Sequence, residues 1–210
     1  MRELGIEGVS RRRGRKRTTV AAEASKAAPD LLERRFCAER PDQVWVADIT
    51  YIPTHEGWLF LAAVVDLCSR RVVGWSMRPD LQADLVVDAV SMAIARRKPV
   101  AGVVHHSDRG SQYASLAFGT TLRDCGRVAS MGSRGDAYDN ALAESFMSTI
   151  KTELINTQTW RTRDQARLAV FRYIESFYNP LRRHSSLGMH SPDEYEKLIN
   201  QQQSQAASAA

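Results

Sequence analysis

The sequence predicts an α/β fold, a mixed five-stranded sheet with helices on both faces. Three segments rich in β-branched and aromatic residues follow one another between residues 43 and 77, separated only by short turns. Two shorter strand-like segments then alternate with helical segments. Short turns join antiparallel strands, whereas a helical crossover can return the chain parallel to an earlier strand. The predicted order is therefore βββαβαβα, followed by further helices.

The first three strands are expected to form an antiparallel meander. They read QVWVADITYI over residues 43–52, WLFLAAVV over 58–65 and RVVGWSM over 71–77. The later elements, in chain order, are a helix over 81–96, a strand over 102–106, a helix over 113–125, a strand over 127–130, a Gly-rich loop over 131–139, and helices over 140–154, 162–178 and 192–200. The large aromatic residues of these segments are predicted to lie in the core, namely Trp45, Trp58, Trp75, Phe171 and Phe177.

Length and composition predict one folded domain with flanking arms. With 210 residues, 43% of them apolar, the chain can bury one sizeable core. We expect a basic arm or linker over residues 1–37, the folded domain over 38–200 and a disordered low-complexity tail over 201–210. No apolar run approaches the roughly 20 residues that span a bilayer, and the N-terminus lacks the apolar stretch of a signal peptide. A cytoplasmic protein without membrane contact is therefore expected.

The positive charge is concentrated in the arm. The net charge is +5, and residues 1–20, with seven basic and two acidic residues, carry all of it. The basic cluster consists of Arg11, Arg12, Arg13, Arg15, Lys16 and Arg17. Such a run favours contact with nucleic-acid phosphates through counterion release. A solvated tail without a partner is the alternative. The three cysteines are odd in number and form no Cys-x-x-Cys pair, so neither a disulfide framework nor a zinc ribbon is predicted.

Three acidic residues stand where a carboxylate needs an explanation. Asp48 interrupts an apolar strand, and burying an unpaired carboxylate would cost several kcal/mol. A metal ion or a buried arginine partner would compensate it. Asp108 follows the fourth strand, at the strand end where ligands gather, although a turn-capping role is equally common there. Glu144 lies in the first turns of a helix after a Gly-rich loop, where an ordinary surface glutamate is the alternative.

Together, the three acidic residues indicate a function more strongly than each does alone. If the first and fourth strands are parallel neighbours, Asp48 and Asp108 face each other, and the helix after the loop can bring Glu144 beside them. Three close carboxylates repel one another and are tolerable when divalent cations neutralise them. Oxygen ligands of this kind select Mg²⁺ or Mn²⁺. Two such ions stabilise the attacking and leaving oxygens of an in-line phosphoryl transfer.

Several ordered motifs carry a family resemblance. They read VWVADITYI over 44–52, AAVVDLCSRRVVGW over 62–75, HHSDRGSQY over 105–113, GDAYDNALAESFMSTIKTE over 135–153 and FYNPLRRHSSLGMHSPDEYE over 177–196. With 35 residues between Asp108 and Glu144, this pattern resembles the DD(35)E catalytic core of retroviral integrases. It resembles more closely the bacterial insertion-sequence transposases of family three, in their second-frame product. The resemblance covers roughly residues 38–200.

The resemblance implies an RNase H-like fold and an integrase-type catalytic domain over residues 38–200. It implies a DDE-type transposase, a polynucleotidyl transferase in which water attacks a phosphodiester at the element end. The freed 3′-hydroxyl then attacks another DNA strand, with no covalent enzyme intermediate. Asp48, Asp108 and Glu144 would be the catalytic residues and the ligands of two Mg²⁺ or Mn²⁺ ions.

The expected partners follow from the same resemblance. Lys151 lies two helical turns beyond Glu144, so the two share a face on which Lys151 can contact a DNA phosphate. Further candidate DNA contacts are Arg109, beside Asp108, and the loop residues Arg182, Arg183 and His184, for which a solvated loop is the alternative. The DNA partners would be the terminal inverted repeats of the element and its target. We also expect a homo-oligomer on DNA, action at the nucleoid, and an upstream-frame product supplying helix-turn-helix recognition.

Other polar residues are interpreted as structural, and two other functions stay open. Asp66 is read as a turn residue, and His105 and His106 as structural neighbours of Asp108. An RNase H-like nuclease would hydrolyse nucleic acid without joining strands. An inactive DNA-binding derivative would be expected to lack a carboxylate, but all three are present.

Overall fold

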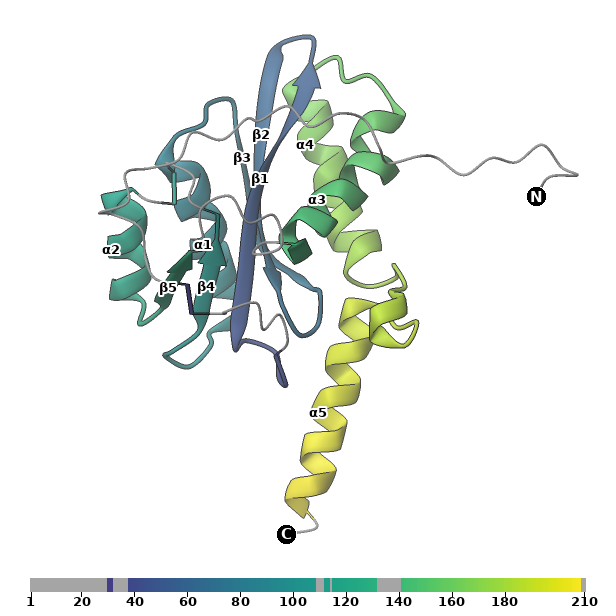
Figure 1. Cartoon of the computed structure of the whole chain (residues 1–210). Helices are drawn as coiled ribbons and strands as arrows, with labels where there is room; N and C mark the ends of the chain where they lie inside the picture. The colour runs from purple at the N-terminus through teal and green to yellow at the C-terminus, as the bar shows by residue number, and fades with distance from the viewer. Residues whose placement is uncertain (1–29, 32–37, 109–111, 114, 132–140, 209–210) are drawn as a thin grey trace, which may run out of the picture.

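The computed structural model describes residues 30–31, 38–108, 112–113, 115–131 and 141–208 (Figure 1). Its strands are β1 (Val44–Thr54), β2 (Gly57–Asp66), β3 (Val72–Arg78), β4 (Val104–Ser107) and β5 (Val128–Met131). Its helices are α1 (Ala83–Arg97), α2 (Leu116–Asp124), α3 (Ala141–Glu153), α4 (Arg163–Arg172) and α5 (Pro192–Ser208). Short 3₁₀ turns span Ile155–Thr157 and Ser185–Leu187, and a π-helical segment, Tyr173–Tyr178, continues α4. The predicted order of strands and helices is confirmed.

The five strands form one mixed sheet in the order β3-β2-β1-β4-β5. β1, β2 and β3 are antiparallel neighbours, as short turns between strands require. β4 pairs parallel with β1, and β5 pairs parallel with β4, because a helix precedes each of these two strands. The parallel pairing of the first and fourth strands was predicted from the helical crossover between them.

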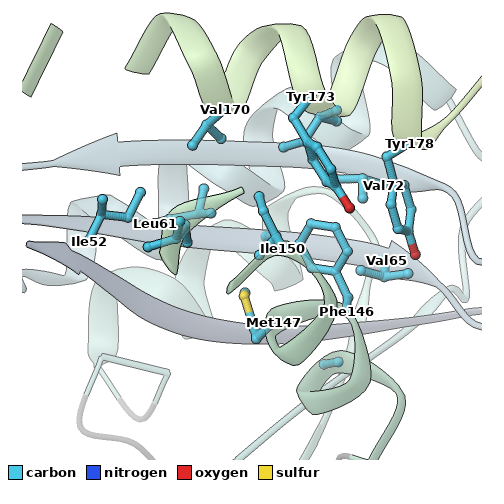
Figure 2. Packing of buried hydrophobic residues seen from close by; sticks show 14 of the residues in the cluster. Ile52, Leu61, Val65, Val72, Phe146, Met147, Ile150, Val170, Tyr173 and Tyr178 are labelled. Carbon is cyan, nitrogen blue, oxygen red and sulfur yellow. The ribbon is translucent and has the colours of Figure 1, made fainter. Parts of the chain in front are cut away.

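Two hydrophobic cores lie on opposite faces of the sheet. One core packs α3, α4 and the π-helical segment against β1, β2 and β3, with Phe146, Ile150 and Ile174 among its buried residues (Figure 2). The other packs α1 and α2 against the opposite face, with Trp45 and Leu85 among its buried residues. Side chains alternate along each strand, so one strand supplies both cores. The expected helices on both faces are therefore present (Figure 1).

Glycine at position 74 allows α1 to approach the sheet closely. A Cβ atom there would lie 2.2 Å from the carbonyl oxygen of Ala89 and 2.8 Å from Cβ of Ala93. We expect Gly74→Ala to lower the free energy of unfolding by about 1–3 kcal/mol, because α1 must move away from β3. Urea denaturation measures this. Gly119→Ala in α2, where nothing lies within 4 Å, is the control and should be neutral or stabilising. Equal stability of the two variants would contradict the expectation.

Two expectations about the chain surface are wrong. Trp58, Phe171 and Phe177 are 51%, 46% and 43% exposed, although their segments predicted core positions. Trp58 lies in β2 before Phe60, the first residue of β2 that pairs with β3, so β1 is its one strand neighbour. The last helix ends at Ser208 and not near Asn200, so residues 201–208 are helical and do not form a disordered tail. Ala and Gln favour helix, which explains the extension.

Within the described ranges, every helix is too short or too polar to cross a bilayer.

Candidate active site

Asp48 and Asp108 occupy matching positions on neighbouring parallel strands. The β1–β4 register runs to Ala47 opposite Ser107, and each aspartate is the next residue of its chain. Both therefore stand at the carboxyl end of the paired segment, where ligand-binding side chains of parallel strands gather. This is the arrangement predicted for the first two carboxylates.

The third carboxylate comes from a helix on the same face of the sheet as Asp48. Val46 and Ile52 alternate with Asp48 in the way that puts all three on one face, and both belong to the core beneath α3 and α4. Glu144 lies exposed in the first turn of α3, which packs against β1. The fold thus places the helix that carries Glu144 over the face that carries Asp48.

Electrostatics link the three carboxylates. Burial raises the pKa of Asp48 to about 7, while the backbone N–H of Ile49, 2.7 Å from its Oδ1, opposes this shift. The charges of Asp108 and Glu144 raise the same pKa further, and the ammonium of Lys151 lowers it. All four side chains therefore interact electrostatically in one neighbourhood. Concentrated negative charge of this kind favours cation binding.

The carboxylates are not closed into a ligand cluster. Among the residues that the structure describes, no three His, Cys, Asp or Glu side chains are close enough to hold a metal ion. Residues 109–111, which follow Asp108, and residues 132–140, which precede α3, lie outside the described ranges. The metal-ligand roles of Asp48, Asp108 and Glu144 therefore stay predictions.

Lys151 lies beside exposed aromatic side chains. Its Nζ is 5.1 Å from the centroid of the Tyr51 ring, and Tyr51 meets Trp58 edge-on at 4.9 Å. Tyr51 is 38% exposed. The sequence predicted Lys151 as a contact but did not single out Tyr51, because its place on β1 looked like that of any strand aromatic.

The predicted loop contacts have partners within the protein. Arg182 forms an ion pair with Glu153 at 2.7 Å, and Arg183 donates to the carbonyl oxygen of Met189 at 2.8 Å. Burial, and then the charge of Arg182, lowers the pKa of His184 to about 4. The structure groups these residues beside α3, and their contact with DNA stays a prediction. Arg109 and the arm residues Arg11, Arg12, Arg13, Arg15, Lys16 and Arg17 lie outside the described residues.

The polar residues interpreted as structural have structural contacts. The side chain of Asp66 is buried and accepts from the backbone N–H groups of Cys68 and Ser69, which closes the β2–β3 turn. His106 is buried, with Nδ1 2.9 Å from the hydroxyl of Ser130. His105 is also buried, and burial lowers its pKa to about 3, so it is neutral.

Tyr113 is a buried neighbour of the site that the sequence did not single out. It is 3% exposed, and within the described ranges its hydroxyl has no hydrogen-bond partner. Burial raises its pKa well above the ordinary value, and the charges of Asp48 and Asp108 raise it further. Its place in the motif HHSDRGSQY was the one available signal.

Family models and solved structures agree on the fold. One integrase core domain model matches residues 38–137 and a second matches residues 127–192. The chain is similar to the HTLV-2 integrase catalytic core domain in complex with magnesium, with a TM-score of 0.58, 16% identity, and coverage of 76% of this chain and 99% of that one. For the catalytic core domain of BIV integrase the TM-score is 0.56 at 18% identity, with coverage of 77% and 98%. These likenesses establish the expected RNase H-like fold.

Sequence relatives identify the family. The chain is 45% identical to the transposase for insertion sequence element IS904 of Lactococcus lactis, over 83% of this chain and 69% of that protein. It is 43% identical to transposase InsF for insertion sequence IS3A of Escherichia coli, over 92% and 68%. For the transposase of IS629 from Shigella sonnei the identity is 41%, over 94% and 65%. The chain spans about two thirds of the length of these relatives, and it belongs to the insertion-sequence transposases that carry an integrase core domain.

Proposed function

We propose that this chain catalyses divalent-metal-dependent cleavage and joining of DNA strands at the ends of an insertion sequence. The observation that carries the proposal is the placement of Asp48 and Asp108 at the carboxyl end of the paired segment of β1 and β4, together with the packing of α3, which carries Glu144, against β1. The names of the relatives support transposition as the biological process.

Asp48, Asp108 and Glu144 would hold two Mg²⁺ or Mn²⁺ ions. Their oxygen donors suit these cations, and the HTLV-2 integrase catalytic core was solved in complex with magnesium. When bound, such ions supply the charge that stabilises the attacking and leaving oxygens of phosphoryl transfer. Burial is the main cause of the raised pKa of Asp48, and the charges of Asp108 and Glu144 add to it; a bound cation would offset both effects.

The chain's own side chains would hold and orient the DNA strand. Lys151 lies within electrostatic range of Asp48 and shares a helix face with Glu144, so its ammonium can donate to a phosphate beside the carboxylates. The exposed Tyr51 and Trp58 offer ring faces on which an unpaired base can stack. These three residues would position the phosphodiester for attack without taking part in proton transfer.

The partners would be the terminal inverted repeats of the element and its target DNA. The basic arm over residues 1–37 would add contacts to phosphates without sequence preference. The solved structures similar to this chain include an intasome of simian T-cell lymphotropic virus and a trimeric form of the HTLV-2 integrase core, which supports assembly of several copies on DNA. An upstream-frame product would supply recognition of the element ends. A DNA substrate of this kind would place the reaction at the bacterial nucleoid in the cytoplasm.

A strand-transfer assay tests the function. The full chain is incubated with labelled oligonucleotides that carry the element ends, with Mg²⁺, with Mn²⁺, or with a chelator. We expect nicked and joined products only with a divalent ion, because the carboxylates need it to act on a phosphodiester. Hydrolysis without joining would replace the proposal with a nuclease, and DNA binding without any product would replace it with an inactive derivative.

A further inference from the structure

A polar pocket lies beside α3, on the part of the helix next to Glu144. Its volume is about 250 Å³, and it is bounded by α3, the β2–β3 turn and the loop after α4. The side chains around it include Arg70, Ser145, Thr149, Arg182, His184 and Ser185. Phe146 and Tyr178, whose ring centroids are 5.0 Å apart, also line it, and Figure 2 shows both rings in the hydrophobic core. The lining combines cationic and hydroxyl groups and contains no carboxylate.

Arg70 is one of three arginines that line this pocket, and unlike Arg182 it forms no ion pair with a described residue. It is half-buried, and burial lowers the pKa of its guanidinium. Within the described part of the chain it has no carboxylate within ion-pair distance, whereas the next residue, Arg71, pairs with Asp193 and Glu196. Burial removes part of the hydration of this guanidinium, and a bound anion would compensate for that loss.

The backbone conformation at Arg70 favours a residue other than arginine. Its φ angle is +64°, in the left-handed region where glycine or asparagine is ordinarily preferred. The turn itself is held by Asp66 through backbone hydrogen bonds, and it does not need the arginine side chain. The guanidinium at this position is thus accommodated against the local backbone preference.

The neighbours of Arg70 reinforce a positive potential. Burial is the main cause of the low pKa of His184, and the charges of Arg182 and Arg70 lower it further. This imidazole is therefore neutral, and both guanidinium groups lie close enough to it to affect its charge. Arg182 is partly neutralised by Glu153, while Ser145 and Ser185 bring hydroxyl donors to the same pocket. Guanidinium and hydroxyl groups around a small polar space suit a phosphate oxygen.

We propose that this pocket binds one phosphodiester of the DNA backbone, with Arg70 as the anchoring cation. The inference rests on the proposed function, since its ligand is the strand that the carboxylates process. Ser145 follows Glu144 directly in α3, so side chains from the same helical turn contribute to the carboxylate site and to the pocket. A DNA strand that crosses the first turns of α3 would contact both the carboxylate site and the pocket, and the pocket would fix the position of the strand.

The test compares duplex DNA binding of the full chain and two charge variants. Arg70→Gly removes the guanidinium and suits the positive φ, so the fold should be preserved. Arg123→Ala, at an exposed position of α2, removes the same charge elsewhere. We expect Arg70→Gly to weaken binding roughly ten-fold and to reduce the slope of log K against log salt by about 1, because one phosphate contact is lost. Arg123→Ala should change neither quantity. Equal affinity of Arg70→Gly and the native chain would overturn the proposal.

Two further arms separate the possible outcomes. Titration with inorganic phosphate, followed by the NMR signals of His184, should show binding that Arg70→Gly abolishes. If phosphate binds through Arg70 but duplex affinity does not depend on it, the pocket serves free phosphate and the DNA proposal fails. All binding is measured without divalent ions and repeated in the Asp48→Asn background. If Arg70→Gly lowers DNA affinity in the Asp48→Asn background, the phosphodiester site is supported even if the strand-transfer assay shows no product.

Discussion

Asp48→Asn, Asp108→Asn and Glu144→Gln should each reduce strand cleavage and joining by roughly a thousand-fold or more. Each substitution removes one anionic oxygen donor, and several kcal/mol of transition-state charge stabilisation depend on the bound cations. The measurement is the rate of nicked and joined product formation with saturating Mg²⁺. Asp164→Asn removes an exposed carboxylate in the first turn of α4 and should leave the rate unchanged. Native activity in any of the three site variants would refute its assigned role.

The folded state of Asp48→Asn separates lost chemistry from lost structure. The pKa of Asp48 rises from 3.8 to about 7 on folding, so its favourable contribution at low pH disappears as pH rises through 7. At pH 8 without metal, the uncharged variant should therefore be more stable than the native chain. After allowance for the partial exposure of this carboxylate, we expect about 1 kcal/mol, or roughly 2–4 °C in melting temperature. At pH 4 the difference should vanish. A lower melting temperature at pH 8 would show that Asp48 serves the fold.

Arg97→Met should produce the largest loss of stability, about 3–5 kcal/mol. Arg97 pairs with Asp42 and with Glu196, each at 2.8 Å, and its own side chain is 16% exposed. Its removal leaves Glu196, whose side chain is 9% exposed, with a single cation, Arg71, at 3.2 Å. A buried carboxylate that loses one of its partners bears its desolvation cost with less compensation. Urea denaturation followed by circular dichroism measures the change.

The expected loss of stability is large because several elements meet at Glu196. Its Oε1 accepts from the hydroxyl of Ser69 at 2.8 Å, which links the first turns of α5 to the β2–β3 turn. Arg97 adds the end of α1, and Asp42 adds the chain just before β1. The control is Arg167→Met, which breaks an exposed pair with Asp164 and should cost at most about 1 kcal/mol. Equal losses in the two variants would contradict a special role of this network.

Local patterns in the sequence were sufficient for the order of the elements. The segments rich in β-branched and aromatic residues became β1, β2 and β3, and the helical stripe over 81–96 became α1. The helical crossover correctly predicted that β4 lies parallel to β1. Pattern could not place Trp58, because its exposure depended on where the neighbouring strand β3 ends.

The candidate site, too, could be predicted from the sequence only in part. The sequence by itself singled out Asp48, Asp108 and Glu144 as candidates, and its ordered motifs indicated the family that the relatives show. Only the tertiary structure decided the register that aligns the two aspartates and the turn that carries Arg70 beside α3. Burial, ion pairing and pocket shape depend on residues far apart along the chain, which no local pattern encodes. An arginine in a turn looks solvated until the packing around it shows that its charge has no partner.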